Sequence, residues 1–108
     1  MTLKTKEELV PELRQAMIDI YDTAKKECNY NPTRFLEMLH KKGSLETVKY
    51  LIHTNKVSSG FTKLWECGRL DLSVEAVILE MPYCTLFSEA ELDIAKKRLT
   101  EYNYYKAA

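Results

Sequence analysis

Apolar residues near the start of the chain recur at intervals of three and four positions, and this spacing restricts the fold more than any other feature. They lie on one face of a helix: Leu9, Leu13, Ala16, Met17, Ile20, Tyr21, Ala24 and Cys28. Thr5, followed by Glu8, forms a capping-box pattern ahead of them. Pro11 predicts either a kink or a helix start near residue 10.

Caps and breakers divide the rest of the chain into further short helices, and no segment of useful length alternates apolar and polar residues as a half-buried strand does. The predicted boundaries are Asn31-Pro32, Gly43, Ser44, Gly68, Asp71 or Ser73, Pro82 and the second capping box Ser88/Glu91. We therefore expect an all-α fold of about six helices, packed as a compact single-domain bundle over residues 1–108.

The segment GFTKLWECGRLDL contains the only tryptophan of the chain. Phe61, Leu64 and Trp65 share a helical face, which predicts that all three side chains belong to the core. Arg69 follows a predicted glycine C-cap and is expected to lock the next turn by pairing with Asp71, Glu75 or Glu66. At the end of the chain, Tyr102, Tyr104 and Tyr105 either cover the core edge or contribute to an interface.

Charge is balanced overall but unevenly distributed. The 16 basic and 16 acidic residues cancel, so the net charge does not favour nucleic acid or an anionic membrane. Residues 66–93 nevertheless contain seven acids and a single base. Such a run is usually solvated surface, but it would also suit docking to a basic protein. The predicted partner-binding residues are Glu66, Asp71, Glu75, Glu80, Glu89, Glu91 and Asp93.

The opposite imbalance occurs in residues 25–56, which carry seven bases and three acids. Five of the bases could cluster near one helical hairpin: Lys25, Lys26, Arg34, Lys41 and Lys42. They could contact phosphates, although Glu27 and Glu37 are interleaved with them. A nucleic-acid contact and a simple solvated face both remain open.

The residues that carry common chemistries are not arranged for them. Cys28, Cys67 and Cys84 are widely spaced, as are His40 and His53, so no close pair of metal ligands is present. A glycine-rich phosphate loop is missing as well. We expect no catalytic residues, metal or cofactor, and a protein that is not an enzyme.

The cysteine count and the polar N-terminus predict the cellular setting. Three cysteines are an odd number, and MTLKTKEELV does not resemble a signal peptide. No apolar run approaches 18 residues, so no membrane association is expected. We predict a cytoplasmic protein with free thiols packed as small apolar groups.

Four motifs together resemble a small bacterial all-helical domain. They are YNPTRFLEML, GFTKLWE, RLDLSVE and LFSEAELDIAKKRL, and they span residues 30–99, roughly two thirds of the chain. Domains of this pattern occur alone or appended to larger proteins, including ones similar to restriction and other DNA-acting enzymes. Some stand-alone helical proteins of this size look like immunity proteins of contact-dependent growth inhibition, which neutralise a nuclease toxin. The resemblance brings no catalytic residues.

Two functional hypotheses follow. The first is a non-catalytic, immunity-type inhibitor whose acidic second half binds a basic toxin or nuclease domain. The alternative is an accessory nucleic-acid-binding module of a restriction-type system that uses the basic segment.

Overall fold

The computed structural model describes residues 5–31, 33–102 and 104. These residues contain five α-helices and two short 3-10 helices. The elements are α1 (Lys6–Glu27), α2 (Thr33–Ile52), α3 (Ser59–Cys67), η1 (Leu70–Leu72), α4 (Val74–Ile78), η2 (Tyr83–Leu86) and α5 (Glu89–Glu101). None of the described residues lies in a strand. The prediction of an all-α fold is confirmed.

Side-chain caps begin most of these helices where the sequence predicted them. Thr5 and Ser88 form complete capping boxes at the starts of α1 and α5. Ser73, rather than Asp71, caps α4 by accepting from the backbone N–H of Ala76. Pro11 lies inside α1, so the alternative start near residue 10 is wrong. The predicted first-turn proline, Pro32, lies outside the described residues.

Gly43 divides α2 into two helical segments, 33–42 and 44–52. Its φ of +81° is accessible to glycine and strained for residues with a side chain, so the helical path breaks where the sequence predicted. Ser44 was predicted to cap the following segment, but its buried hydroxyl instead donates to the carbonyl of Val10 at 3.1 Å. This bond attaches the bend of α2 to α1.

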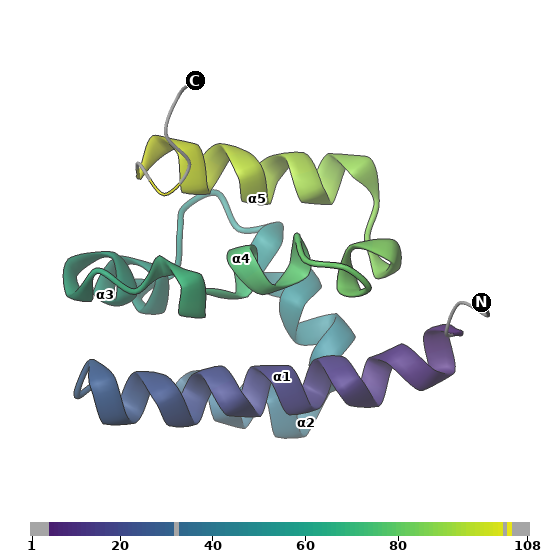
Figure 1. The fold of residues 1–108 in the computed structure, drawn as a ribbon. Helices are drawn as coiled ribbons and strands as arrows, with labels where there is room; N and C mark the ends of the chain where they lie inside the picture. Colours follow the sequence, from purple (N-terminus) through teal and green to yellow (C-terminus); the bar gives the residue numbers. More distant parts are fainter. Residues whose placement is uncertain (1–4, 32, 103, 105–108) are drawn as a thin grey trace.

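The helices are arranged around a core that α1 and α5 cover from opposite sides (Figure 1). Between them lie α3, η1 and α4, and α2 crosses behind this layer from α1 towards α5. The core is built from the apolar faces predicted by helical spacing. Its largest fully buried apolar side chains are Leu13, Met17, Leu39, Val48, Ile52, Phe61, Ile78 and Leu99.

Arg98 of α5 joins three helices through a buried guanidinium. It donates to the carbonyls of Leu51 and Ile52 in the last turn of α2, at 3.0 and 3.2 Å, and to that of Thr54 just beyond it, at 2.7 Å. It also pairs with Glu75 of α4 at 3.1 Å. The carbonyls at the end of a helix have no partner within the helix. Arg98 satisfies them and holds α4 and α5 against α2.

A disulfide joins Cys28, just after α1, to Cys67, the last residue of α3. The Cα atoms of the pair lie 5.8 Å apart. The prediction of free thiols is therefore wrong for these two residues and holds for Cys84. Disulfides persist mainly in oxidising compartments. The Cys28–Cys67 disulfide therefore removes free thiols as a reason for predicting a cytoplasmic location.

The helical face of Phe61, Leu64 and Trp65 is only partly buried. Phe61 is 2% exposed and Leu64 is also buried, but Trp65 is 47% exposed. Trp65 lies at the outer edge of an aromatic group, with its ring centroid 5.3 Å from that of Tyr102, which in turn lies 4.9 Å from Phe61. The prediction that Trp65 belongs to the core does not hold, because the last residues of α3, from Trp65 to Cys67, are exposed.

The disulfide predicts a measurable difference between oxidised and reduced protein. Loop-closure entropy for a sequence separation of 39 residues corresponds to about 4 kcal/mol. Replacing Cys28 and Cys67 together by Ser should lower the free energy of unfolding in urea by up to this amount. Dithiothreitol should lower the stability of the wild type equally and leave the double variant unchanged. Three reactive thiols in the untreated native protein would contradict the pairing.

Phe61 and Trp65 should differ in their contributions to stability. We expect Phe61→Ala to cost about 3–5 kcal/mol because it leaves a cavity. Trp65→Ala should cost about 2 kcal/mol, because roughly half of the indole is already in water. Chemical denaturation of both variants measures the difference, and equal losses would show that Trp65 is a full member of the core.

Candidate functional site

Two of the seven predicted partner-binding acids are buried. Glu75 and Glu91 are each 4% exposed, and each forms an ion pair with a cation of another helix. Burial raises the pKa of Glu75, and its hydrogen bond to Arg98 opposes that rise. The structure therefore does not place these two carboxylates on the surface, and they hold helices together.

Glu91 is the centre of a polar cluster at the start of α5. It accepts from the backbone N–H of Ser88 at 3.0 Å and from Lys49 of α2 at 3.1 Å, and it lies 2.9 Å from His53 Nε2. Burial raises the pKa of Glu91, but the bonds from Ser88, His53 and Lys49 outweigh it and lower the pKa to about 2. The Glu91 carboxylate is therefore ionised at neutral pH, and its contacts attach α5 to α2.

Asp71 is exposed but already paired with Arg69, as the sequence predicted. The guanidinium donates to both carboxylate oxygens, at 3.0 and 3.1 Å, and lowers the pKa of Asp71. The same guanidinium pairs with Glu27 at the end of α1, a contact that the sequence did not indicate. Arg69 therefore connects the turn after α3 to α1, next to the disulfide.

The remaining four acids, Glu66, Glu80, Glu89 and Asp93, are exposed and do not all lie on one element. Glu66 lies near the end of α3, which the disulfide joins to the end of α1. This end of the molecule is opposite the start of α5 (Figure 1). Glu80 follows α4, and Glu89 and Asp93 lie one turn apart at the start of α5, so we name these three residues the α4–α5 acidic end. The connection there also holds Met81, which is 68% exposed.

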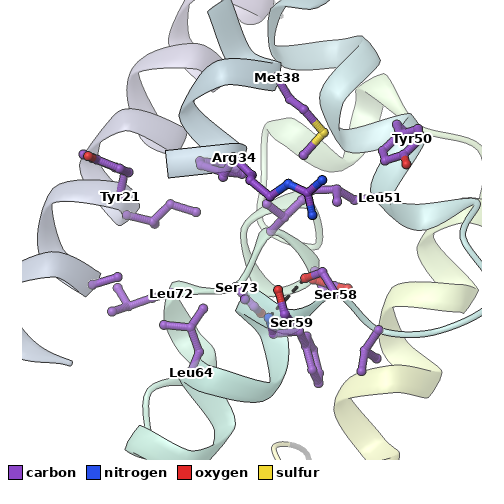
Figure 2. A pocket seen from close by; sticks show the side chains of 18 of the residues that line it. Tyr21, Arg34, Met38, Tyr50, Leu51, Ser58, Ser59, Leu64, Leu72 and Ser73 are labelled. Atoms are coloured by element: carbon purple, nitrogen blue, oxygen red, sulfur yellow. Dashed lines mark hydrogen bonds between the residues drawn. The ribbon is translucent and has the colours of Figure 1, made fainter. Parts of the chain in front are cut away.

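A cavity of about 640 Å³ opens between α1, the two halves of α2 and the start of α3 (Figure 2). Its walls are mainly aliphatic and aromatic, and hydroxyl groups and cations surround them. The apolar and aromatic lining includes Ile20, Tyr21, Ala24, Tyr30, Phe35, Met38, Tyr50, Leu51, Val57, Phe61, Leu64, Leu72 and Val74. This size is typical of small-molecule sites.

Four cationic side chains line the cavity: Arg34, Lys41, Lys42 and Lys56. Arg34 extends from α2 towards the middle of the opening (Figure 2). Lys42 lies over the ring of Tyr50, with Nζ 4.4 Å from the centroid. Of the five basic residues predicted to cluster, Lys25 and Lys26 do not line the cavity, and Lys56 joins the others from the loop after α2. Arg98 donates to the carbonyl of Thr54 in that loop, a contact that sequence spacing does not reveal.

A metal site and a membrane span have less support than this cavity among the described residues. In the part of the chain that the structure describes, no group of three or more histidine, cysteine, aspartate or glutamate side chains is placed to hold a metal ion. Among the same residues, no helix is long and apolar enough to cross a membrane. Comparison with known proteins finds no matching family model, curated protein or solved structure. The geometry of the chain itself therefore carries the functional argument.

Glu91 should make stability depend on pH. Its folded-state pKa of about 2 lies below the ordinary value of 4.5, so the ionised carboxylate stabilises the fold above about pH 4.5, and this contribution is lost as pH falls towards 2. Glu91→Gln should cost about 2 kcal/mol at pH 7, and the difference from wild type should shrink in acid. Thermal melts from pH 7 to 2 measure this.

The matched control is Glu89→Gln, two residues away and exposed, which should follow the wild-type pH profile. A constant difference between Glu91→Gln and wild type across the whole range would contradict the lowered pKa of Glu91.

Proposed function

We propose that the protein is a non-catalytic, immunity-type inhibitor that binds a basic toxin or nuclease domain through the α4–α5 acidic end. The observation that carries this proposal is the pairing of unneutralised acids with an exposed apolar side chain. Within the described residues, Glu80, Glu89 and Asp93 form no ion pair, whereas Glu75, Glu91 and Asp71 all do. Three negative charges are thus available for a partner.

Met81 supports a protein as that partner. Met81 is the most exposed of the large hydrophobic side chains that the structure describes. Methionine is enriched at protein interfaces because its flexible, polarisable side chain adapts to the partner surface. The exposed side chain next to Glu80 gives the acidic end an apolar anchor, while the surrounding charges raise the association rate with a basic surface.

A bacterial setting and a cytoplasmic location belong to the same proposal. An immunity protein would act where the toxin acts, and a nuclease toxin acts on nucleic acid inside the cell. The cytoplasm is reducing, whereas Cys28 and Cys67 form a disulfide in the structure. Thiol counting on protein prepared from reducing and oxidising compartments would show which state is the working one.

Charge reversal tests the acidic end. The triple variant Glu80→Lys, Glu89→Lys and Asp93→Lys should slow association with a catalytically inactive toxin domain encoded next to this gene about tenfold at low salt, because electrostatic steering is lost. Met81→Ala should instead raise the dissociation rate, because it removes a buried contact. Surface plasmon resonance at two salt concentrations, together with a nuclease inhibition assay, measures both effects.

The control triple variant Asp22→Lys, Glu46→Lys and Glu101→Lys changes the net charge equally at exposed positions away from the α4–α5 connection. It should leave the association rate within about twofold of wild type. Equal slowing by both triple variants would mean that only net charge matters. Uninhibited nuclease activity with the wild-type protein would overturn the proposal.

A further inference from the structure

We propose that the cavity between α1, α2 and α3 is a binding site for a small organic anion that has a flat aromatic body and a phosphate or carboxylate group. This site is separate from the α4–α5 acidic end and does not depend on its function. The proposal rests on three features of the cavity: its aromatic walls, its unneutralised cations and the small number of acids facing it.

The walls suit a flat apolar body. Five aromatic residues line the cavity, of which Phe61 belongs to the buried core and Tyr50 is half exposed: Tyr21, Tyr30, Phe35, Tyr50 and Phe61. Aromatic rings favour edge and offset-stacked contacts with another ring. The hydroxyl of Tyr30 lies beside Gly60. A Cβ atom added at position 60 would be only 3.0 Å from this phenol oxygen. The glycine leaves the space that the Tyr30 ring and hydroxyl occupy beside the start of α3.

The rim suits the anionic group. Within the described residues, Arg34 and Lys41 form no ion pair or hydrogen bond through their side chains. An unpaired guanidinium presents a planar fork that binds phosphate or carboxylate through two parallel hydrogen bonds. The first turn of α3 also lines the cavity with Ser58 and Ser59. Its backbone N–H groups and helix dipole add positive potential on the side facing Arg34 (Figure 2).

The acids at the cavity do not reverse this balance. Glu75 lies at the inner wall, but Arg98 neutralises it at 3.1 Å. Glu37 is exposed, and the same lining contains four cations. A cationic or zwitterionic ligand would meet net repulsion there. A neutral aromatic molecule would leave the guanidinium of Arg34 without a partner.

The shape favours a small molecule over a nucleic-acid strand. A strand binds along a continuous basic track, and Lys25 and Lys26, which would extend the track, do not line the cavity. A volume of about 640 Å³ instead encloses one ligand of ordinary size. The class includes mononucleotides, which carry both a flat ring and a phosphate.

Isothermal titration with a set of matched probes tests the requirement for both parts of the ligand. The probes are 1-naphthyl phosphate and adenosine monophosphate, compared with 1-naphthol, inorganic phosphate and decanoate. We expect at least one ring-bearing phosphate to bind about tenfold more tightly than the ring or the phosphate alone, since each part contributes separately. Decanoate binding as tightly as the aromatic phosphates would overturn the aromatic body. Inorganic phosphate binding equally well would overturn the cavity as the site.

Substitutions at the exposed rim locate the site without disturbing the core. Arg34→Gln with Lys41→Gln should weaken binding of the best probe at least about tenfold, because charge-assisted hydrogen bonds are lost. Lys26→Gln with Lys97→Gln removes the same charge elsewhere and should stay within about twofold. Ser59→Trp should fill the opening and abolish binding while all cations remain.

Two outcomes would overturn the assignment. One is equal weakening by the two double variants, which would indicate a general charge effect. The other is binding of duplex DNA or RNA at low salt that depends on Arg34 and Lys41 while none of the small probes binds. That result would make the rim a nucleic-acid surface. Toxin inhibition is measured separately at the α4–α5 acidic end, so failure of one proposal leaves the other standing.

Discussion

The hydrogen bonds and the ion pair of Arg98 are the interactions on which the rest of the structure depends. One buried guanidinium satisfies three carbonyls at and just beyond the end of α2 and the carboxylate of Glu75. Burying an ion pair is costly unless the remaining donors also find partners, and here a single side chain makes four such contacts. The consequence reaches beyond α5. Arg98 holds the carbonyl of Thr54 in the loop after α2, and the next part of this loop, Lys56, Val57 and Ser58, lies in the cavity wall.

Glu91 uses the same principle at the other end of α5. Its carboxylate combines a helix cap with a bridge to Lys49 and His53 of the neighbouring segment. An excess of acids in the sequence therefore gave a misleading picture of the surface. Of seven acids in residues 66–93, Glu75, Glu91 and Asp71 hold the fold together through ion pairs. Charge counts along a chain cannot separate surface charge from internal pairs, because the pairing cation comes from a distant segment.

Local features were predictable from the sequence, and long-range ones were not. The capping boxes at Thr5 and Ser88 and the helix breaks at Gly43 and Gly68 depend on residues within a turn of one another, so their patterns can be read directly. The Arg69–Asp71 pair was predictable for the same reason. The disulfide, the exposure of Trp65 and the cavity depend on how α1, α2 and α3 pack. Of the cavity, the sequence indicated only that Arg34, Lys41 and Lys42 are close to one another.

The disulfide and the cavity are connected through the chain. Cys28 and Cys67 close a loop that contains the start of α2, the bend at Gly43, the loop after α2 and all of α3. Most of the cavity wall, including all four of its cations, comes from this loop. The rest comes from α1, through Ile20, Tyr21 and Ala24, and from the segment of η1 and α4 that holds residues 72–75. Oxidised cysteines prevent α3 from separating widely from α1 even when other contacts loosen. A ligand that touches α1, α2 and α3 together would oppose the same separation. Covalent closure and occupancy of the cavity would therefore stabilise one arrangement of these helices, while the α4–α5 acidic end, outside the loop, stays free to contact a partner.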